Sequence, residues 1–464
     1  MKFFIILLLL FSNMVISFCQ DTKYEIDSIV IKGNKRTKSY IIYNELDFKL
    51  KDSVSLSELE KIFGRNQSRL LGTSIFIAAD FNISEINSKN KSIIIELTVT
   101  ETWYLFPYFY FDLIDRNLSE WIYLHNASLK RVNLVVNLRH NNLSGNRDIL
   151  ELKLMTGISK KIELTYSRPF IKENNRLGLM FNILIKKSNE IAYNTLNNKL
   201  VFYKNFDHSI FYQNRFLTEL TYRPSIDILH SLDIAYFANK TDTIITNNLN
   251  PDFFDNKSKQ NYFSIKYRFE TDRRNYKIYP TKGFSAYTEI EKVGLFQLND
   301  IDQLILWGGF EKYFNLTNKL YSSIIFDFKY SILDHDDSYF NNKALGYFDK
   351  FLNGYELYVV DGRHYAMLKT SQKYNFLKGN LNLNKIIKVN QFKSIPYDLF
   401  LTLNFDSGYV DNNINFADNN FNNRLLYGGG IGLDLILYHN LYRMSYSINH
   451  TGESGFYFHF KTIF

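Results

Sequence analysis

The chain has 464 residues, with 55 Lys and Arg against 47 Asp and Glu and a formal net charge of +8. The basic residues are dispersed and form no binding arm, which argues against a nucleic-acid partner. The chain also contains 34 Tyr and 41 Phe beside 6 Pro. Such an aromatic content is unusual in a soluble protein and typical of a membrane β-barrel, whose interfaces carry aromatic girdles.

The first residues are typical of a secretory signal. Lys2 precedes an apolar run from Phe3 to Phe11, and Ser17-Phe18-Cys19 offers small residues for cleavage before Gln20. We therefore predict a signal peptide at residues 1–19. The alternative is that Cys19 is a lipoprotein acceptor, although the large Phe18 disfavours this. If the only cysteine leaves with the signal, the mature chain has no disulfide and no cysteine metal site.

Residues 21–102 predict a small α+β domain. Apolar spacing and turn residues give the order strand, helix, helix, strand, strand, which is enough to enclose one core. The expected elements are a strand at 24–31, a helix capped by Thr37, a helix starting at Ser55 or Ser57, and strands near 76–83 and 92–99.

From Trp103 onward the apolar pattern has a period of two. Leu150, Leu152 and Leu154 alternate with Glu151 and Lys153. The same alternation recurs at 263–270, 399–406 and 431–437. A soluble β-sandwich would show such alternation too. Strands of about 10 residues, joined alternately by short turns and long loops, favour a transmembrane barrel instead.

Past residue 19 no apolar run reaches the ~18–20 residues of a membrane helix. A closed barrel is then the one spanning structure left, since every backbone group in lipid must be hydrogen-bonded internally. The length of residues 103–464 fits about 16 antiparallel strands. Arg268 and Lys329 fall on the polar face of this pattern, where we expect the lumen.

Several motifs together resemble a known family. The segments in the first domain resemble a POTRA domain, and those in the rest resemble the surface-antigen barrel of the BamA/TamA assembly-factor superfamily. The POTRA-like segments are Gly33-Asn34-Lys35-Arg36-Thr37, Asn66-Gln67-Ser68-Arg69-Leu70 and Ser74-Ile75-Phe76. The barrel segments are 115–121, 272–275 with 280–283, Asp406-Ser407-Gly408, 428–432 and the C-terminal aromatic strand.

This resemblance covers nearly the whole mature chain and completes the expected organisation. It implies a mainly β protein: a signal peptide at 1–19, a POTRA-like periplasmic domain at 21–102, and a barrel of about 16 strands at 103–464 in the outer membrane. The implied partners are the lipid bilayer, unfolded outer-membrane or secreted client proteins, and periplasmic chaperones or lipoproteins. No cofactor is implied.

One departure from the family lies on a loop that the resemblance places in the lumen. Family members carry an Arg-Gly-aromatic motif there, whose arginine pairs with acidic residues of the wall. Here Asn353 precedes Gly354 and Tyr355. Because asparagine is neutral and shorter, we expect the buried charge-assisted pair to be lost. Arg363 is the alternative source of that charge.

The last strand has two compatible interpretations. Phe456, Phe458 and Phe460 alternate with polar residues, and the sequence ends at Phe464. This pattern predicts a lipid-facing strand, and the resemblance implies that it is also the signal read by the insertion machinery. We expect it to form a seam with the first barrel strand, near 104–113. Tyr104 and Pro107 lie in that strand, and Pro107 cannot donate a ladder hydrogen bond, so it marks either a weak seam or a strand end.

Motifs for catalysis are not found. The sequence has no Gly-x-Ser-x-Gly elbow and no phosphate-binding loop. Residues 334–337 could be a metal or acid–base site, but a solvated loop explains them better, as it does His364. We therefore predict a protein that is not an enzyme and has no metal site. The leading hypothesis is an assembly, insertion or translocation factor. The alternative is a non-catalytic pore or structural surface barrel.

Overall fold

The computed structural model describes residues 22–172, 176–295, 300–334, 338–382, 394–412, 419–437 and 440–462. The predicted signal peptide, Phe464 and residues 335–337 lie outside this range. The chain divides into two compact units: Met1–Tyr104 with Asn141–Arg147, and Leu105–His140 with Asp148–Phe464. Within the described residues, no helix is both long and apolar enough to cross a membrane.

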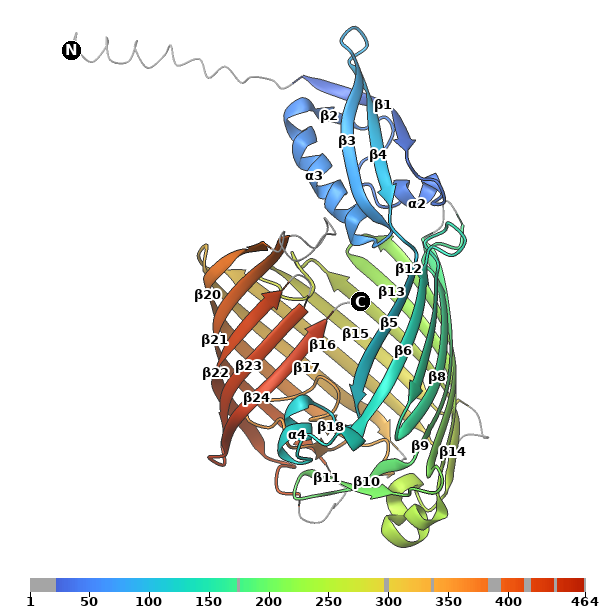
Figure 1. Cartoon of the computed structure of the whole chain (residues 1–464), viewed down its shortest axis with the longest axis vertical. Coiled ribbons are helices and arrows are strands. Elements are labelled where there is room, and N and C mark those ends of the chain that lie inside the picture. Colours follow the sequence, from blue (N-terminus) through green and yellow to red (C-terminus); the bar gives the residue numbers. More distant parts are fainter. Residues whose placement is uncertain are drawn as a thin grey trace, which may run out of the picture. The chain divides into compact units, whose positions relative to one another are not determined.

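The first unit is a four-stranded mixed sheet with two helices (Figure 1). The sheet order is β2-β1-β4-β3, with β1 parallel to β4 and the other pairs antiparallel. The expected order of elements is confirmed, and a short additional strand, β2, precedes the second helix. The elements are β1 Lys23–Lys32, α2 Ser39–Tyr43, β2 Ser53–Ser55, α3 Leu56–Gly72, β3 Phe76–Asn87 and β4 Ser92–Glu101.

The two helices of this unit begin differently from one another. Ser55 is the N-cap residue of α3, and its N–H donates to the Glu58 carboxylate (3.4 Å), which decides between the two predicted starts. Thr37 does not cap α2, whose N-cap residue is Lys38. The reason is that the Thr37 hydroxyl accepts a hydrogen bond from the side chain of Asn142 in the same unit (2.9 Å).

The second unit is an antiparallel sheet of sixteen strands, as predicted (Figure 1). Its strands are β5 Leu105–Leu113, β6 Val132–Asn141, β7 Ile149–Thr156, β8 Ser159–Arg168, β9 Leu177–Ser188, β12 Phe211–Ser225, β13 Ile228–Thr241, β14 Lys259–Asp272, β15 Gly283–Val293, β16 Gln303–Asn315, β17 Leu320–Asp334, β20 His364–Asn382, β21 Ser394–Asp411, β22 Leu425–Leu437, β23 Asn440–Asn449 and β24 Ser454–Thr462.

The connections between these strands carry the remaining elements. Two small hairpins are formed by β10 with β11 and by β18 with β19. The bounds are α4 Leu118–Tyr123, η1 Leu129–Arg131, β10 Glu190–Leu196, β11 Lys199–Lys204, η2 Ile245–Leu249, η3 Pro251–Phe254, β18 Lys343–Leu345 and β19 Val360–Asp361.

The wall of the large sheet is apolar outside and polar inside. On β21, the side chains of Leu401 and Leu403 are 53% and 61% exposed, whereas the intervening Thr402 and Asn404 are buried. A soluble sheet has the opposite arrangement, so the apolar face is suited to lipid. Lys329 is buried, and Arg268 pairs with Glu270 and Glu289, as the predicted polar face requires.

Glu101 at the end of β4 ties the loop after β1 to the sheet of the first unit. Its carboxylate accepts hydrogen bonds from the N–H groups of Thr37 (2.6 Å) and Arg36 (3.1 Å). Burial alone would raise the pKa of Glu101, but the hydrogen bonds from Thr37 and Arg36 outweigh it and lower the pKa below its usual value. A carboxylate with a lowered folded-state pKa stabilises the fold above its unfolded pKa of about 4.3 and loses this effect on acidification.

We therefore predict that Glu101→Gln weakens the acid sensitivity of the first unit. Between about pH 5 and pH 3, β4 in the wild-type chain should lose protection from amide hydrogen exchange more steeply than β4 in the variant. Exchange measured by mass spectrometry on the full chain checks this. Glu60→Gln, on α3, is the matched control. An unchanged acid response in the Glu101 variant would contradict the assignment.

Candidate functional site: the seam and the lumen loop

The two end strands of the sheet are β24 and β5. In the part of the chain that the structure describes, β24 pairs with β23 and β5 with β6, and no ladder joins β5 to β24. Figure 1 shows the two strands at the open side of the sheet, with α4 beside β24. Each strand thus presents an edge of backbone groups able to pair with another strand. We call this opening the seam.

A cavity of about 1210 Å³ lies at the seam. Its walls come from both edge strands, α4 and the loop between β17 and β20. Apolar side chains of β5 and β24, such as Phe111 and Phe460, contribute one part of the lining. Charged side chains of the lumen, such as Lys369 and Arg443, contribute another. The cavity therefore has an apolar and a polar side.

The predicted seam residues of β24 alternate across the wall. Phe456 and Phe460 are exposed on the outer face, and Tyr457 between them is buried. Phe458 and Phe460 both line the seam cavity, whereas Phe456 lines a separate groove. The expected lipid-facing pattern of this strand is present in its described part. Phe464 lies outside the described residues, and the role of the strand as an assembly signal stays a prediction.

The two predicted residues at the start of the barrel lie in different settings. Pro107 is the third residue of β5, opposite Leu138 of β6, and so does not mark a strand end. An edge strand is where a proline is tolerated within a sheet. Tyr104 precedes β5 and belongs to the first unit, where its hydroxyl lies 3.3 Å from that of Thr37. The seam role of both residues stays a prediction.

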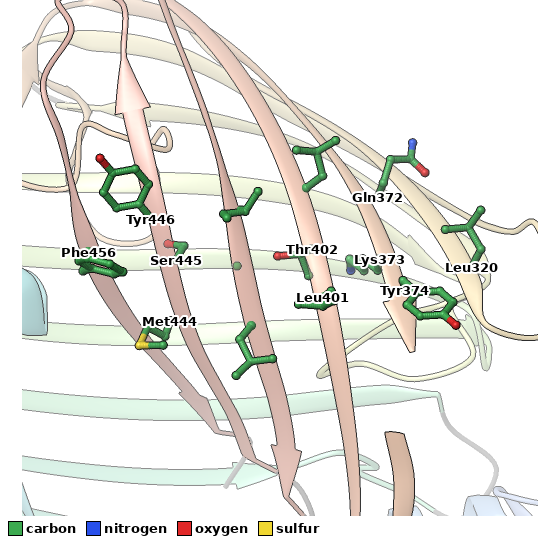
Figure 2. A pocket seen from close by; sticks show the side chains of 14 residues that line it. Leu320, Gln372, Lys373, Tyr374, Leu401, Thr402, Met444, Ser445, Tyr446 and Phe456 are labelled. Atoms are coloured by element: carbon green, nitrogen blue, oxygen red, sulfur yellow. The ribbon is translucent and has the colours of Figure 1, made fainter. Parts of the chain in front are cut away.

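The separate outer groove has a volume of about 540 Å³ and lies over the start of β17 and over β20 to β24 (Figure 2). Leu401, Met444, Tyr446 and Phe456 line it. These side chains are all exposed on the outer face of the barrel. The groove is therefore part of the lipid-facing surface, where acyl chains can fill it.

The segment that carries Asn353 binds directly to the wall. The backbone N–H and side-chain amide of Asn353 both donate to Oδ2 of Asp406 (3.0 and 2.7 Å). Asp406 is 1% exposed, and Lys369 Nζ lies 3.4 Å from the same oxygen. The loop thus brings no positive charge to Asp406, as the neutral Asn353 implies, and is attached to the wall there by hydrogen bonds. The cation comes from the wall: Lys369 stands directly opposite Asp406 in the β20–β21 ladder.

Glycines in the wall let the loop approach so closely. A Cβ atom on Gly428 would lie 2.1 Å from the carbonyl oxygen of Asn353, and one on Gly408 would lie 2.8 Å from the side chain of Leu352. Gly354 itself has φ of +84°, which favours glycine. The motifs that contain Gly408 and Gly428 are thus explained by the loop that docks on them.

The other predicted loop residues have distinct roles. Tyr355 is buried and donates to the carbonyl oxygen of Tyr427 (3.2 Å), and its hydroxyl also contacts His450. Arg363 directly precedes β20, where its carbonyl oxygen accepts a hydrogen bond from Ser331 (3.3 Å). The cation on Asp406 is Lys369, so Arg363 does not replace the expected arginine there.

The segment Asp115–Trp121 contacts the loop between β17 and β20, a role that its sequence does not predict. The Arg116 guanidinium donates to backbone carbonyl oxygens of the loop at Gly346 and Tyr358. Asn117 donates to the carbonyl oxygen of Glu356 (2.8 Å). The sequence feature that could have indicated this role is the high proportion of polar side chains in residues 115–120, where five of the six residues are polar or charged.

A group of potential metal ligands occurs in the same region. Single ligand atoms of Asp115, Glu120 and His125 lie within 4.8 Å of one another. However, Arg131 holds Asp115 at 2.8 Å, and Arg116 holds Glu120 at 2.9 Å. The two arginines compensate both carboxylates, so the geometry is that of an ion-pair cluster.

No protein-family model matches the sequence, and no curated protein matches it either. Among solved structures, it is similar to BamA from Haemophilus ducreyi lacking POTRA domains 1–3, with 13% identity over 94% of this chain and 84% of that chain, and a TM-score of 0.59. The chain has the BamA fold. It is also similar to CdiB from Acinetobacter baumannii, with 11% identity, coverage of 95% and 73%, and a TM-score of 0.51.

The BamA-type fold confirms the sequence-based expectation of a sixteen-stranded barrel preceded by a small α+β unit. Together with the apolar exterior, it confirms the predicted location in the outer membrane, with the first unit in the periplasm. The lipid bilayer is accordingly a partner of this chain.

We predict that Lys369 and the buried carboxylate of Asp406 are energetically coupled. Lys369→Met leaves a buried carboxylate without its cation and should cost about 1–3 kcal/mol of barrel stability. Adding Asp406→Asn to that variant should recover most of the loss, because no uncompensated charge remains. The temperature at which the purified barrel loses its folded mobility in detergent gels measures both effects. Additive losses in the double variant would contradict the coupling.

Proposed function

We propose that this protein assembles, inserts or translocates other proteins at the outer membrane, by pairing their strands with the edges at its seam. The observation that carries this proposal is that β5 and β24 form no ladder with each other among the described residues. Unpaired backbone groups in a membrane are costly, so an edge at the seam favours an incoming strand that satisfies them.

The chemistry of the seam cavity matches such a client. A strand of an outer-membrane barrel alternates between apolar and polar side chains. The cavity offers Phe460 and Leu134 on its apolar side and Lys369 and Arg443 on its polar side. Main-chain hydrogen bonds would supply affinity that tolerates many client sequences. This pairing needs no nucleotide, cofactor or catalytic group, and we propose that the protein is not an enzyme.

The first unit is proposed to capture unfolded clients in the periplasm. Its strand β3 is twelve residues long and lies at one end of the sheet order, paired only with β4 among the described strands. An edge of this length can accept an extended segment as a further strand. A unit that serves only as a spacer is the alternative. Periplasmic chaperones or lipoproteins would be further partners of this unit.

The other candidate function is a non-catalytic pore or structural surface barrel. The docking of the loop argues against a wide, permanently open pore. Asn353 is bound to the wall by two hydrogen bonds to Asp406, and Gly428 packs directly against its carbonyl oxygen. An assembly factor is therefore the better account of the lumen.

We predict that locking the seam abolishes client assembly. Cysteines at Phe111 and Phe460, which both line the seam cavity, would be joined by a bifunctional thiol reagent. Insertion of an outer-membrane client into vesicles that contain the cross-linked protein should fall to background, because the client can no longer pair with β24.

The matched control joins two strands that are already paired. Leu403 and Ile431 stand directly opposite each other on the outer face of β21 and β22, and cysteines there would be linked in the same way. This control should retain client insertion. Full activity of the seam-locked protein, with its cross-link verified, would refute the proposed mechanism.

A further inference from the structure

We propose that the segment Asp115–Trp121 is a latch that holds the free edge of β24 and links it to the lumen loop. Here the lumen loop means residues 343–361. This inference deepens the proposed function, because it names the group that an incoming strand must displace and the movement that follows.

The first half of the latch is a hydrogen bond at the edge of β24. The backbone N–H of Phe458 donates to the side-chain oxygen of Ser119 (3.0 Å). Ser119 lies in α4 and is 0% exposed. An added strand would offer a backbone carbonyl oxygen to such a donor. Ser119 therefore occupies the position of a strand partner, and a client that pairs at Phe458 must replace it.

The second half of the latch holds the lumen loop. Arg116 donates to the carbonyl oxygens of Gly346 and Tyr358, and Asn117 donates to that of Glu356 (2.8 Å). These bonds connect the two residues just before α4 to three points of the loop. Since a guanidinium presents several donors in a fixed geometry, Arg116 holds these backbone groups in one arrangement.

The two halves are joined within a few residues. The side chain of Asn117 caps α4 by accepting a hydrogen bond from the N–H of Glu120 (2.8 Å). The Glu120 carboxylate in turn accepts from the backbone N–H of Arg116 (3.0 Å) and pairs with its guanidinium. Ser119 lies inside this bonded turn, so a movement of its backbone away from β24 would disturb the groups that hold the loop.

A further contact links the loop to β24 directly. Glu356, whose carbonyl oxygen binds Asn117, has its carboxylate 3.6 Å from the ring of His459, the neighbour of Phe458. Displacement of Ser119 by a client strand would thus loosen both attachments of Glu356. Opening of the seam and release of the lumen loop from the wall are then one coupled event.

Amide hydrogen exchange on the purified full-length barrel in lipid nanodiscs tests the latch without any client. In the variant Ser119→Ala, exchange at the Phe458 amide should be about tenfold faster, as expected from the loss of one hydrogen bond to a buried partner. The matched control is Ser454→Ala on the same strand, where the lost hydrogen bond is to Tyr446. The control should leave exchange at Phe458 unchanged.

A second variant tests the coupling. Arg116→Lys keeps the charge beside Glu120 but removes the several donors of the guanidinium that hold the loop. Among the described hydrogen bonds, Arg116 makes none to β24, so any effect of this variant on β24 must be transmitted through the latch. Exchange in residues 346–358 should become several-fold faster, and exchange at Phe458 should rise with it. If the variant changes the loop alone, or if Ser119→Ala behaves as the control does, the latch is refuted.

These outcomes are separate from the fate of the proposed function. Client insertion into vesicles would be measured on the same variants. Faster exchange at Phe458 in both latch variants supports the latch even if no client is inserted. In that case the assembly function fails and the latch stands as a device that controls a pore.

Discussion

A backbone that crosses a membrane must hydrogen-bond every N–H and C=O group within the protein, and the whole barrel follows from this constraint. The fifteen pairs of neighbouring strands in the sixteen-stranded sheet satisfy this constraint through their hydrogen-bond ladders. The described parts of β5 and β24 do not pair with each other, so their edges need other partners. At Phe458 the structure supplies one from the side chain of Ser119. The seam, where the described parts of two strands lack a ladder with each other, is thus the place at which we propose that client strands bind.

The lumen loop depends on a second constraint, which is the cost of burying a charge. Asp406 is almost fully buried and is stabilised by two donors of Asn353 and by the ammonium group of Lys369. The family resemblance leads one to expect an arginine on the loop as the partner of the buried carboxylate. In this chain two different elements stabilise Asp406 instead. The loop provides neutral donors, and the wall provides the positive charge. The glycines at 408 and 428 complete the arrangement by leaving room for the loop backbone.

Much of the fold was predictable because it rests on local patterns. Alternation such as Leu401, Leu403 and Phe405 against polar neighbours identifies a lipid-facing strand without any knowledge of its neighbours, and strand length then gives the number of strands. The start of α3 could be narrowed to two serines for the same reason. Thr37 was misassigned as a cap because its hydroxyl is engaged by Asn142, more than a hundred residues away in the sequence.

The site was less predictable, since its key contacts depend on strand register. Lys369 and Asp406 become partners only when β20 pairs with β21 in the observed alignment, which the sequence pattern does not specify. Arg363 is closer in sequence to Asn353 than Lys369 is, and is therefore the candidate that the sequence suggests for the missing positive charge. In the structure it directly precedes β20, and Lys369 pairs with Asp406 instead. The role of Ser119 was equally hidden, because it consists of one bond to a backbone group 339 positions away.

The central claim is that this barrel serves other outer-membrane or secreted proteins. Depletion of the protein in its own cells, followed by quantitative profiling of the outer membrane, tests this claim most directly. We expect that a set of other barrel or secreted proteins declines in the outer membrane and accumulates unfolded in the periplasm. An outer-membrane protein profile that changes only by the loss of this chain would contradict the proposed function.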